Sequence, residues 1–339
     1  MLKILVIRND KIGDFMLAWP ALSLLKKQYP DAEITALVPE YTADLARLCE
    51  WIDCVLIDEK KTFFISDIFQ LKNKIKKQKF DASISLFLQT RTSMALWLSG
   101  IKLRIGPATK IAQIFINQRL RQKRSQSAKP EYEYNIDLIK YYIYLNHDKP
   151  GGTPQPPYLR FDPDEINGLQ NEIRTGFDIP DNSRIIIIHP GTGGSAINLN
   201  TGQYAQLAKQ LATLANVFFI ITAGPGELSQ ATELSEKLQE TRHGMHESKT
   251  GIVNFCKYIN AADIFISGST GPLHIAGALN INTVAFYPAK RSASPTRWQT
   301  TNAENKRLYF SPENPIDNPD MSTLNMSDCA HRIAEHFLK

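Results

Sequence analysis

The sequence predicts an α/β protein that contains doubly wound parallel sheets in two domains. Short apolar segments alternate with amphipathic helical segments, which is the βαβ pattern of a parallel sheet. A cluster of proline and glycine at residues 150–157 interrupts this pattern, which then starts again. Such a cluster fits neither a helix nor a central strand and is typical of a linker. The length of 339 residues is sufficient for two such domains with full cores.

The predicted boundaries follow from this interruption. We expect a first domain over residues 1–150, a linker over 151–160 and a second domain over 161–316. Residues 317–339 should form a C-terminal helix that packs back on the first domain. The expected strands are residues 2–8, 33–38, 54–57, 81–87 and 103–106, and then 184–189, 217–222, 263–266 and 283–287. The clearest helical patterns cover residues 20–29, 201–214 and 253–261.

The composition excludes several classes of protein. A hydrophobic content of 43% and a charged content of 22% are those of a soluble globular protein. No apolar run approaches the roughly 20 residues that span a bilayer, and the chain does not begin with a secretory signal. The four cysteines lack CxxC spacing, so neither a disulfide framework nor a zinc site is expected. The sequence therefore favours a cytoplasmic localisation.

The positive charge of the chain is unevenly distributed. The formal net charge is +5, and basic runs lie at residues 72–79 and 119–124, both in the first half. The solvated face of a helix accounts for the first run. The second run lies in a segment rich in serine and glutamine, which we expect to be a loop, so an anionic partner is more plausible there. No nucleic-acid module accompanies these charges, and an anionic substrate or a membrane surface fits them better.

The first strand is followed by a loop that carries a candidate catalytic carboxylate. Gly13 is the only glycine in residues 9–15, so the GxGxxG motif of dinucleotide-binding domains is absent and dehydrogenase chemistry is disfavoured. Asp14 should lie at or beside a helix N-cap, where free amides and the helix dipole favour an ionised carboxylate. A simple capping role is the alternative interpretation of Asp14.

Basic residues also follow the strands of the first domain. Open α/β sheets bind ligands at the carboxyl ends of their strands. We therefore expect four residues to face one crevice there, although each alone is more often a surface charge: Lys60, Lys61, Arg91 and Arg104.

Three glycine-bearing turns follow strands of the second domain, at residues 190–195, 223–227 and 268–271. The carboxyl ends of parallel strands share one edge of a sheet, so these turns should converge. Pro272 suits the first position of a helix, whose amides and dipole would then favour a phosphate or diphosphate. For the third turn alone, a capped core helix without any ligand is an equally good interpretation.

At these motifs the sequence resembles the lipopolysaccharide heptosyltransferases, glycosyltransferase family 9. The resemblance rests on Gly13-Asp14 with PAL at 20–22, on HPGTGGSA at 189–196 and on STGPLH at 269–274. These motifs follow in the family's order over residues 1–288. The later run PAKRSASP at 288–295 is similar to the branch that adds inner-core heptose near Kdo.

The resemblance implies a GT-B fold, in which two Rossmann-like domains face a cleft. It implies an inverting transfer of heptose from ADP-L-glycero-D-manno-heptose to the Kdo/inner-core region of lipopolysaccharide, at the cytoplasmic face of the inner membrane. The first domain would bind an anionic lipid A–Kdo acceptor and the second the nucleotide sugar. The resemblance implies a metal-independent transfer, so no metal or other cofactor is expected.

The resemblance also implies roles for individual residues. Asp14 matches the family's general base, and Glu227 matches an acidic residue that contacts the nucleoside ribose. The residues that match the diphosphate and sugar contacts are Thr192, Gly193, Gly194, Ser195, Ser269, Thr270, Gly271 and His274. The basic residues that we assign to the anionic acceptor are Lys60, Lys61, Arg91, Arg104, Arg121 and Arg124.

Two positions depart from the family's pattern. Ile197 stands where a lysine or arginine usually neutralises the donor diphosphate, and Ser269 stands where many members carry Asp or Asn. A basic residue from elsewhere in the chain, Lys290, Arg291 or Arg297, is a candidate substitute. Two further functions therefore stay open: a nucleotide-sugar epimerase of similar fold, and a catalytically weakened relative that only binds a nucleotide sugar.

Overall fold

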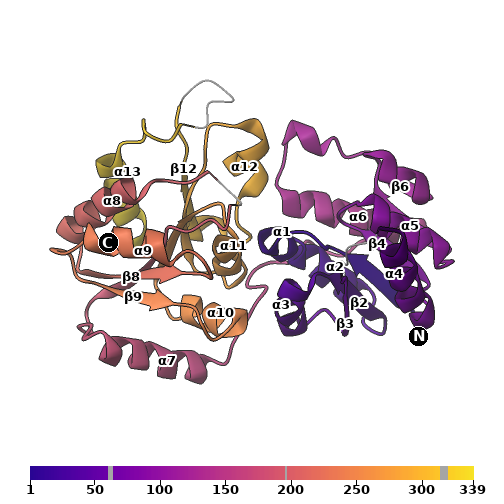
Figure 1. The fold of residues 1–339 in the computed structure, drawn as a ribbon, viewed down its shortest axis with the longest axis horizontal. Coiled ribbons are helices and arrows are strands. Elements are labelled where there is room, and N and C mark those ends of the chain that lie inside the picture. The colour runs from indigo at the N-terminus through magenta and orange to yellow at the C-terminus, as the bar shows by residue number, and fades with distance from the viewer. Residues whose placement is uncertain (60–63, 195–196, 314–319) are drawn as a thin grey trace. The chain divides into compact units, whose positions relative to one another are not determined.

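A computed structural model describes residues 1–59, 64–194, 197–313 and 320–339 of the chain. The chain folds into two compact units, Met1–Ser125 with Lys129–Gln155, and Gln126–Ala128 with Pro156–Lys339 (Figure 1). Each unit contains a six-stranded sheet in which all the paired strands are parallel. The predicted class, α/β with two doubly wound parallel sheets, is confirmed.

The sheet of the first unit has the order β3-β2-β1-β4-β5-β6. Its strands are β1 (Lys3–Ile7), β2 (Glu33–Val38), β3 (Cys54–Ile57), β4 (Ala82–Ser85), β5 (Leu103–Pro107) and β6 (Gln118–Leu120). In this register Ile7 lies between Leu37 on β2 and Ser85 on β4. The strand order reverses between β1 and β4, and such a reversal is where open α/β sheets place their ligands.

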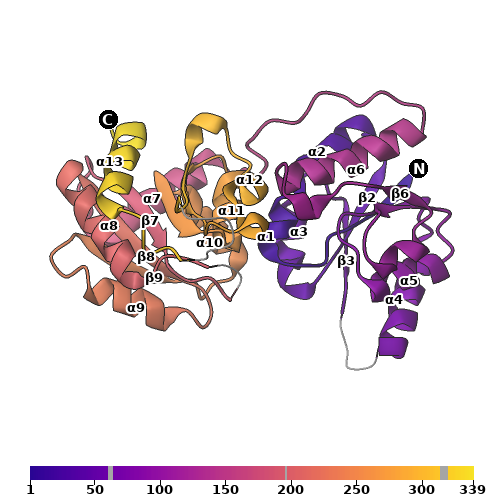
Figure 2. The same cartoon turned by 90° about the horizontal axis from the view of Figure 1, so that it is seen from above.

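Helices cover both faces of this sheet. They are α1 (Ile12–Met16), α2 (Trp19–Gln28), α3 (Ala43–Leu48), α4 (Phe64–Gln78), α5 (Thr90–Leu98) and α6 (Glu131–Leu145), with 3₁₀ turns η1 (Glu40–Thr42), η2 (Ile111–Phe115) and η3 (Arg124–Gln126). Helices α4 and α5 lie side by side (Figures 1 and 2). Leu71 and Ile75 of α4 join Leu5 and Ile7 of β1 in one apolar core, because burial of these side chains drives the helix onto the sheet.

The sheet of the second unit has the order β12-β11-β10-β7-β8-β9. Its strands are β7 (Arg184–His189), β8 (Val217–Ala223), β9 (His243–Glu247), β10 (Ile264–Gly268), β11 (Asn282–Phe286) and β12 (Arg307–Phe310). The central strands β7, β8 and β10 are almost entirely buried and rich in isoleucine. Continuous apolar strands of this kind are typical of a parallel sheet that is covered on both faces.

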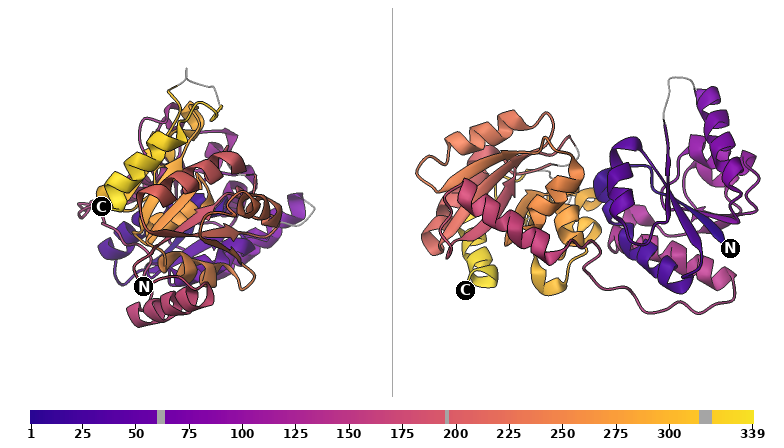
Figure 3. Two further views of the ribbon diagram at one scale, coloured as in Figure 1. Left: turned by 90° about the vertical axis from the view of Figure 1, so that its left-hand side faces the viewer. Right: turned by 90° about the horizontal axis from the view of Figure 1, so that it is seen from below.

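The helices of the second unit are α7 (Pro163–Gly176), α8 (Thr201–Leu214), α9 (Leu228–Glu236), α10 (Ile252–Asn260), α11 (Gly271–Ala278), α12 (Pro295–Trp298) and α13 (Met326–Phe337), with 3₁₀ turns η4 (Arg291–Ala293) and η5 (Glu304–Lys306). Helix α13, yellow in Figure 3, packs against α8. Ala330 and Ile333 of α13 share a core with Leu207 and Leu211 of α8. This corrects the expectation that the C-terminal helix packs on the first domain, since α8 takes up its apolar face.

The structure also contains strands that the sequence pattern did not indicate. These are β6, β9 and β12. Arg119 and Leu120 belong to β6, so the basic run at 119–124 is partly strand rather than loop. Among the helices within the described ranges, none combines the length and the apolar character that crossing a bilayer requires.

Candidate active site

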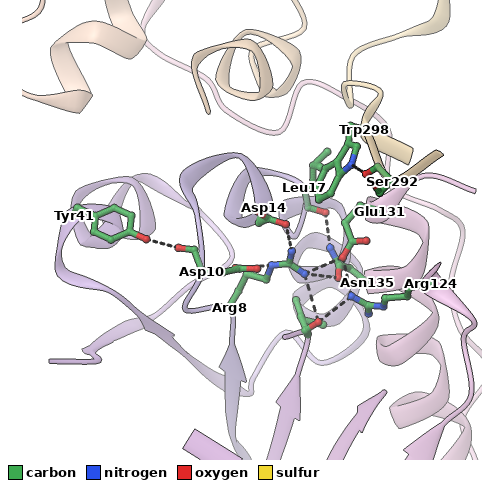
Figure 4. Close-up of polar contacts among 11 residues, drawn as sticks. Arg8, Asp10, Asp14, Leu17, Tyr41, Arg124, Glu131, Asn135, Ser292 and Trp298 are labelled. Atoms are coloured by element: carbon green, nitrogen blue, oxygen red, sulfur yellow. Dashed lines mark hydrogen bonds and ion pairs between the residues drawn. The ribbon is translucent and has the colours of Figure 1, made fainter. Parts of the chain in front are cut away.

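In the first unit, one buried arginine gathers three carboxylates. Arg8 directly follows β1, and its side chain is 2% exposed (Figure 4). Its Nε lies 2.9 Å from Oδ1 of Asp10, and one terminal nitrogen is 3.1 Å from Oε1 of Glu131. The other terminal nitrogen pairs with Oδ1 of Asp14. A single guanidinium therefore holds the candidate base and two further acidic side chains.

Helix α6 closes this cluster from the other side. Glu131 opens α6 and also accepts a 2.7 Å hydrogen bond from Arg124 (Figure 4). Asn135, one helical turn later, accepts from Arg8 at 3.2 Å and donates to the carbonyl oxygen of Leu17 at 3.0 Å. Buried charges are tolerated when they are paired and hydrogen-bonded. Two guanidinium groups facing three carboxylates meet that requirement.

Asp14 is held by this ion pair rather than by a capping bond. It lies in the first turn of α1, whose N-cap residue is Lys11 and has no side-chain capping bond. Its carboxylate instead contacts Arg8, which argues against the simple capping interpretation. The Asp14 side chain is 16% exposed, whereas that of Arg8 is buried. The carboxylate of Asp14 is therefore partly accessible and is oriented by a buried cation.

Asp10 is the most strongly perturbed carboxyl group of the cluster. Burial raises its pKa to about 7, Arg8 opposes the rise, and the neighbouring carboxylates of Asp14 and Glu131 add to it. The Tyr41 hydroxyl donates a 2.6 Å hydrogen bond to the carbonyl oxygen of Asp10 and so fixes its backbone. Asp10 therefore titrates near neutral pH in the folded protein.

Asp10→Asn is expected to stabilise the protein increasingly as the pH rises. The pKa of Asp10 is raised from 3.8 to about 7, so between these values the folded state keeps a proton that the unfolded state has lost. Wild-type stability therefore falls as the pH rises from about 4 to about 7, with a slope of up to about 1.4 kcal/mol per pH unit for a single group. Urea unfolding of both proteins from pH 4 to pH 8 measures this difference. Asp44→Asn, at an exposed carboxylate, is the control, and identical pH profiles for the two variants would contradict the prediction.

Two of the basic residues assigned to the acceptor have internal partners instead. Arg91 is buried on α5 and pairs with Asp58, which directly follows β3. The guanidinium of Arg104 donates to the carbonyl oxygen of Phe115 at 2.8 Å and to that of Ile101. The expectation that both face a crevice is thus corrected, because their charges and donors are used within the unit. Lys60 and Lys61, the other two members of that set, lie outside the described residues.

Arg121 and Arg124 lie together at the carboxyl ends of β5 and β6. With Thr109 and Lys123 they line a cavity of about 330 Å³. Arg121 and Lys123 are exposed, whereas Arg124 is partly buried and donates to Glu131. Three cationic side chains around one cavity favour an anionic group there.

In the second unit, Glu227 joins two of the three glycine-bearing turns. Its Oε1 accepts a 2.7 Å hydrogen bond from the amide of Gly193, in the turn after β7. Its Oε2 accepts a 2.9 Å hydrogen bond from the amide of Gly224, in the turn after β8. The same oxygen lies 3.3 Å from Nε2 of His189, whose Nδ1 is 3.0 Å from Oγ1 of Thr222. One carboxylate thus ties two turns to the end of β7.

These partners keep Glu227 ionised. Burial alone would raise its pKa, but the hydrogen bond and charge of His189 and the amides of Gly224 and Gly193 outweigh burial, so the pKa lies below its usual value. Hydrogen bonds to the charged form have this effect on a carboxylate. Glu227 therefore remains a carboxylate at neutral pH and holds the turns by charge-assisted bonds.

Close approaches at two glycines bring the third turn to the first. A Cβ atom at Gly191 would lie 2.2 Å from the carboxyl carbon of Glu227, and one at Gly268 would lie 2.5 Å from Oδ1 of Asn198. Asn198 in turn donates a 3.0 Å hydrogen bond to the carbonyl oxygen of Pro190. A side chain at either position would displace the Glu227 carboxylate or the Asn198 amide from its present contacts. The expected convergence of the three turns at one edge of the sheet is confirmed.

The third turn opens helix α11. Thr270 is the N-cap residue; its side chain makes no capping bond and lies 3.1 Å from Oγ of Ser267 instead. Gly271 and Pro272 begin the helix, and His274 in its first turn is buried. Burial lowers the pKa of His274 to about 4, so its imidazole is neutral. Its Nδ1 is buried and has no hydrogen-bond partner among the residues described, so one polar atom is left for a ligand.

The remaining donor-site candidates lie in the first turn and around it. The amide of Gly194 donates a 3.2 Å hydrogen bond to Oγ1 of Thr192. Ser195 lies outside the described residues, and Ser269 is partly exposed just before the N-cap of α11. Ile197, which stands where the family's pattern has a basic residue, is 40% exposed.

The candidate substitutes for that basic group follow β11. Lys290 and Arg291 are exposed in the segment after this strand, which ends at the same sheet edge as the three turns. Arg297 on α12 lies 5.4 Å from the ring of Trp298, and the Trp298 indole donates to the carbonyl oxygen of Ser292 at 2.7 Å (Figure 4). Lys290 and Arg291 are thus exposed cations in the segment that leaves this edge of the sheet.

Several residues of these clusters were not singled out by sequence reasoning. Arg8 could have been, because a charged residue directly follows a buried strand and precedes Asp10 and Asp14. Glu131 and Asn135 gave no signal, since they are distant in sequence from Arg8 and look like ordinary helix residues.

The chain is similar to known glycosyltransferases in sequence and in fold. The model of glycosyltransferase family 9 (heptosyltransferase) matches residues 68–323. A Haemophilus influenzae protein that is provisionally described as a glycosyltransferase is 43% identical over 335 residues, covering 99% of this chain and 96% of that protein.

Two solved structures share the fold. A glycosyl transferase family 9 protein from Veillonella parvula has a TM-score of 0.81 at 17% identity, covering 99% of this chain and 97% of that one. The Escherichia coli ADP-heptose lipopolysaccharide heptosyltransferase II has a TM-score of 0.76 at 19% identity, covering 99% of both chains. At such identities the likeness concerns the fold, which is GT-B as expected. With the family model matching most of its length, the chain belongs to glycosyltransferase family 9 (heptosyltransferase).

Proposed function

We propose that this glycosyltransferase transfers heptose from ADP-L-glycero-D-manno-heptose to the Kdo/inner-core region of lipopolysaccharide, with inversion at the anomeric carbon. Its family membership and the ADP-heptose named for its E. coli structural relative support this assignment. The observation that carries it is the convergence of three amide-bearing turns around Glu227 at one sheet edge. Helix N-termini and clustered amides are sites where phosphates bind.

We place the donor diphosphate at these turns. The amides and dipole of α11 would meet the negative charge that develops on the departing ADP, as preorganised donors do at a transition state. The free Nδ1 of His274 would hydrogen-bond to the diphosphate or the sugar. Glu227 would contact the ribose through the lone pairs that its hydrogen bonds to the Gly193 and Gly224 amides leave unused. The other donor contacts in this proposal are Thr192, Gly193, Gly194, Ser195, Ser269, Thr270 and Gly271.

In the transfer step, Asp14 acts as the general base. It accepts the proton of an acceptor hydroxyl while that oxygen bonds to the anomeric carbon of heptose. The bond from the anomeric carbon to the diphosphate breaks, and ADP departs with the electron pair. Because the oxygen attacks opposite to the leaving group, the anomeric configuration inverts. Arg8 is a positioning residue in this proposal, since it orients the carboxylate of Asp14.

The acceptor in this proposal is an anionic lipid A–Kdo molecule. Arg121 and Arg124, which line a cavity with Lys123, are the described residues whose charge suits it. Arg91 and Arg104 no longer belong to this set, because both have internal partners. An acceptor anchored in lipid would place the enzyme at the cytoplasmic face of the inner membrane.

A transfer assay tests this function. The protein is incubated with ADP-heptose and Kdo–lipid A, and the products are analysed by mass spectrometry and by NMR of the anomeric proton. We expect one heptose to be added with release of ADP and inverted configuration. Binding of ADP without any transfer would identify a weakened relative, and conversion of the donor without acceptor would identify an epimerase. Either of these results would overturn the proposal.

Ile197→Lys is expected to tighten ADP binding. A lysine at this exposed position would restore a charge-assisted contact to the diphosphate, which is generally worth about 1.5–3 kcal/mol, or roughly tenfold or more in affinity. Isothermal calorimetry with ADP measures the change. Leu214→Lys, at a position that is 39% exposed against 40% for Ile197, adds the same charge on α8 and is the control. Equal ADP affinities of the two variants would contradict the assignment of the diphosphate to the turn beside Ile197.

A further inference from the structure

Large apolar side chains are concentrated on one part of the surface of the first unit. Of the twelve that are exposed in the described part of the chain, five lie on α4, α5 and η2. Their exposed fractions are 70% for Ile65, 51% for Phe69, 49% for Trp97, 75% for Ile111 and 65% for Ile114. Single exposed apolar residues are normal, but a cluster marks a site of interaction.

The three elements form one continuous surface. Helix α4 packs against α5, and α5 against η2, and the helices lie side by side (Figure 2). The ring of Trp97 is 5.8 Å from that of Phe115 at the end of η2. Ile65, Phe69 and Lys76 share one face of α4 by their helical spacing. Lys76 also lines a cavity together with Gly100, just beyond α5.

The exposed residues are separate from those that pack the core. Ile68, Leu71 and Ile75 of α4 are buried against the sheet, together with Ala95 and Leu96 of α5. Folding of the unit therefore does not require apolar residues on the outer faces of these elements. Their exposure needs another explanation, and contact with a partner provides one.

The same stretch has a larger net positive charge than the whole protein. Residues 64–126 contain thirteen Lys and Arg but only two Asp and no Glu, whereas the whole chain has a net charge of +5. The rest of the chain is therefore net negative. Asp67, one of the two acidic residues, is buried, while Lys76, Lys77, Lys79 and Lys110 are exposed.

We propose that α4, α5 and η2 form a surface that docks on an anionic lipid bilayer. The aliphatic and aromatic side chains would enter the boundary between headgroups and acyl chains, while the lysines contact lipid phosphates. Each Lys or Arg near an acidic leaflet strengthens the attraction to it. Lysine is depleted in protein–protein interfaces, so its abundance here favours lipid over a protein partner. This inference deepens the proposed function, which needs a lipid-linked acceptor, but its evidence does not depend on it.

Co-flotation with vesicles tests the surface. The full-length protein is mixed with phosphatidylcholine vesicles with and without phosphatidylglycerol. We expect binding only with phosphatidylglycerol, and we expect it to weaken with added salt because charges contribute. Phe69→Ser with Ile111→Ser should lower the binding constant at least tenfold, as removal of two inserted apolar side chains predicts. Lys76→Glu with Lys77→Glu should lower it by at least as much.

Matched controls separate this surface from general effects. Leu228→Ser with Tyr309→Ser removes two exposed apolar residues of the second unit and should leave binding unchanged. Thermal unfolding shows whether each variant is folded. Wild-type protein that fails to bind, or surface variants that bind as well as wild type, would overturn the proposal. Transfer to an acceptor without lipid chains should be unaffected by these variants, so failure of docking and failure of the proposed function give different results.

Discussion

Asp14→Asn is expected to lower the transfer rate by a factor of about 10²–10⁴, the usual contribution of a general base. The amide keeps the shape of the side chain but does not accept the proton of the acceptor hydroxyl. Arg8 also loses one of the carboxylates that it contacts, yet it keeps its contacts with Asp10 and Glu131. The fold should therefore survive the substitution.

The measurement separates the rate of transfer from donor affinity. Asp14 belongs to the first unit and the turns assigned to ADP belong to the second, so calorimetry should give an unchanged ADP affinity. Asp44→Asn, which removes an exposed carboxylate on α3, is the control and should transfer at the wild-type rate. Full transfer by Asp14→Asn would exclude Asp14 as the base.

Arg8→Met is expected to lower the free energy of unfolding by about 3–5 kcal/mol, the range for removing one partner of a buried ion pair. Methionine fills much of the arginine volume but leaves Asp10, Asp14 and Glu131 close together without the shared cation. Glu131 keeps its contact with Arg124, so the loss falls mainly on the two aspartates. Urea unfolding at neutral pH measures the effect.

A double-mutant cycle identifies the origin of this loss. Glu131→Gln removes one of the three carboxylates, so Arg8→Met should cost less in that background than in the wild type. Arg47→Met removes the exposed partner of Asp44 and should cost only about 0–1 kcal/mol, as surface pairs do. Equal losses for Arg8→Met and Arg47→Met would show that the buried cluster contributes no more than a surface pair.

Much of the fold could be predicted because its core strands are apolar and its helices have clear ends. The expected bounds of β2, β3, β7 and α8 agree with the structure. The three strands that the pattern did not indicate, β6, β9 and β12, are all at sheet edges. An edge strand pairs with a neighbour on one side only, so fewer of its side chains are buried and its sequence need not be apolar. β9, with the sequence HGMHE, is only partly buried along its length and has no apolar run to detect.

The candidate sites were predictable where they depend on strand order and not where they depend on distant partners. Parallel strands bring their carboxyl ends together, so the convergence of the three turns followed from topology. Arg91 was assigned to a ligand because Asp58, its partner, comes from another strand end. Arg8 and Glu131 are 123 residues apart, and only folding shows that they neutralise each other.

The bonds of Glu227 also determine the thermodynamics of any anion that binds beside it. Because this carboxylate already fixes the turns after β7 and β8, their conformational entropy is lost during folding and not during binding. The amides of Gly193 and Gly224 are taken up by Glu227, so an incoming anion would meet the other donors of turns that are already held in place. Such preorganisation leaves more of the interaction free energy available as affinity.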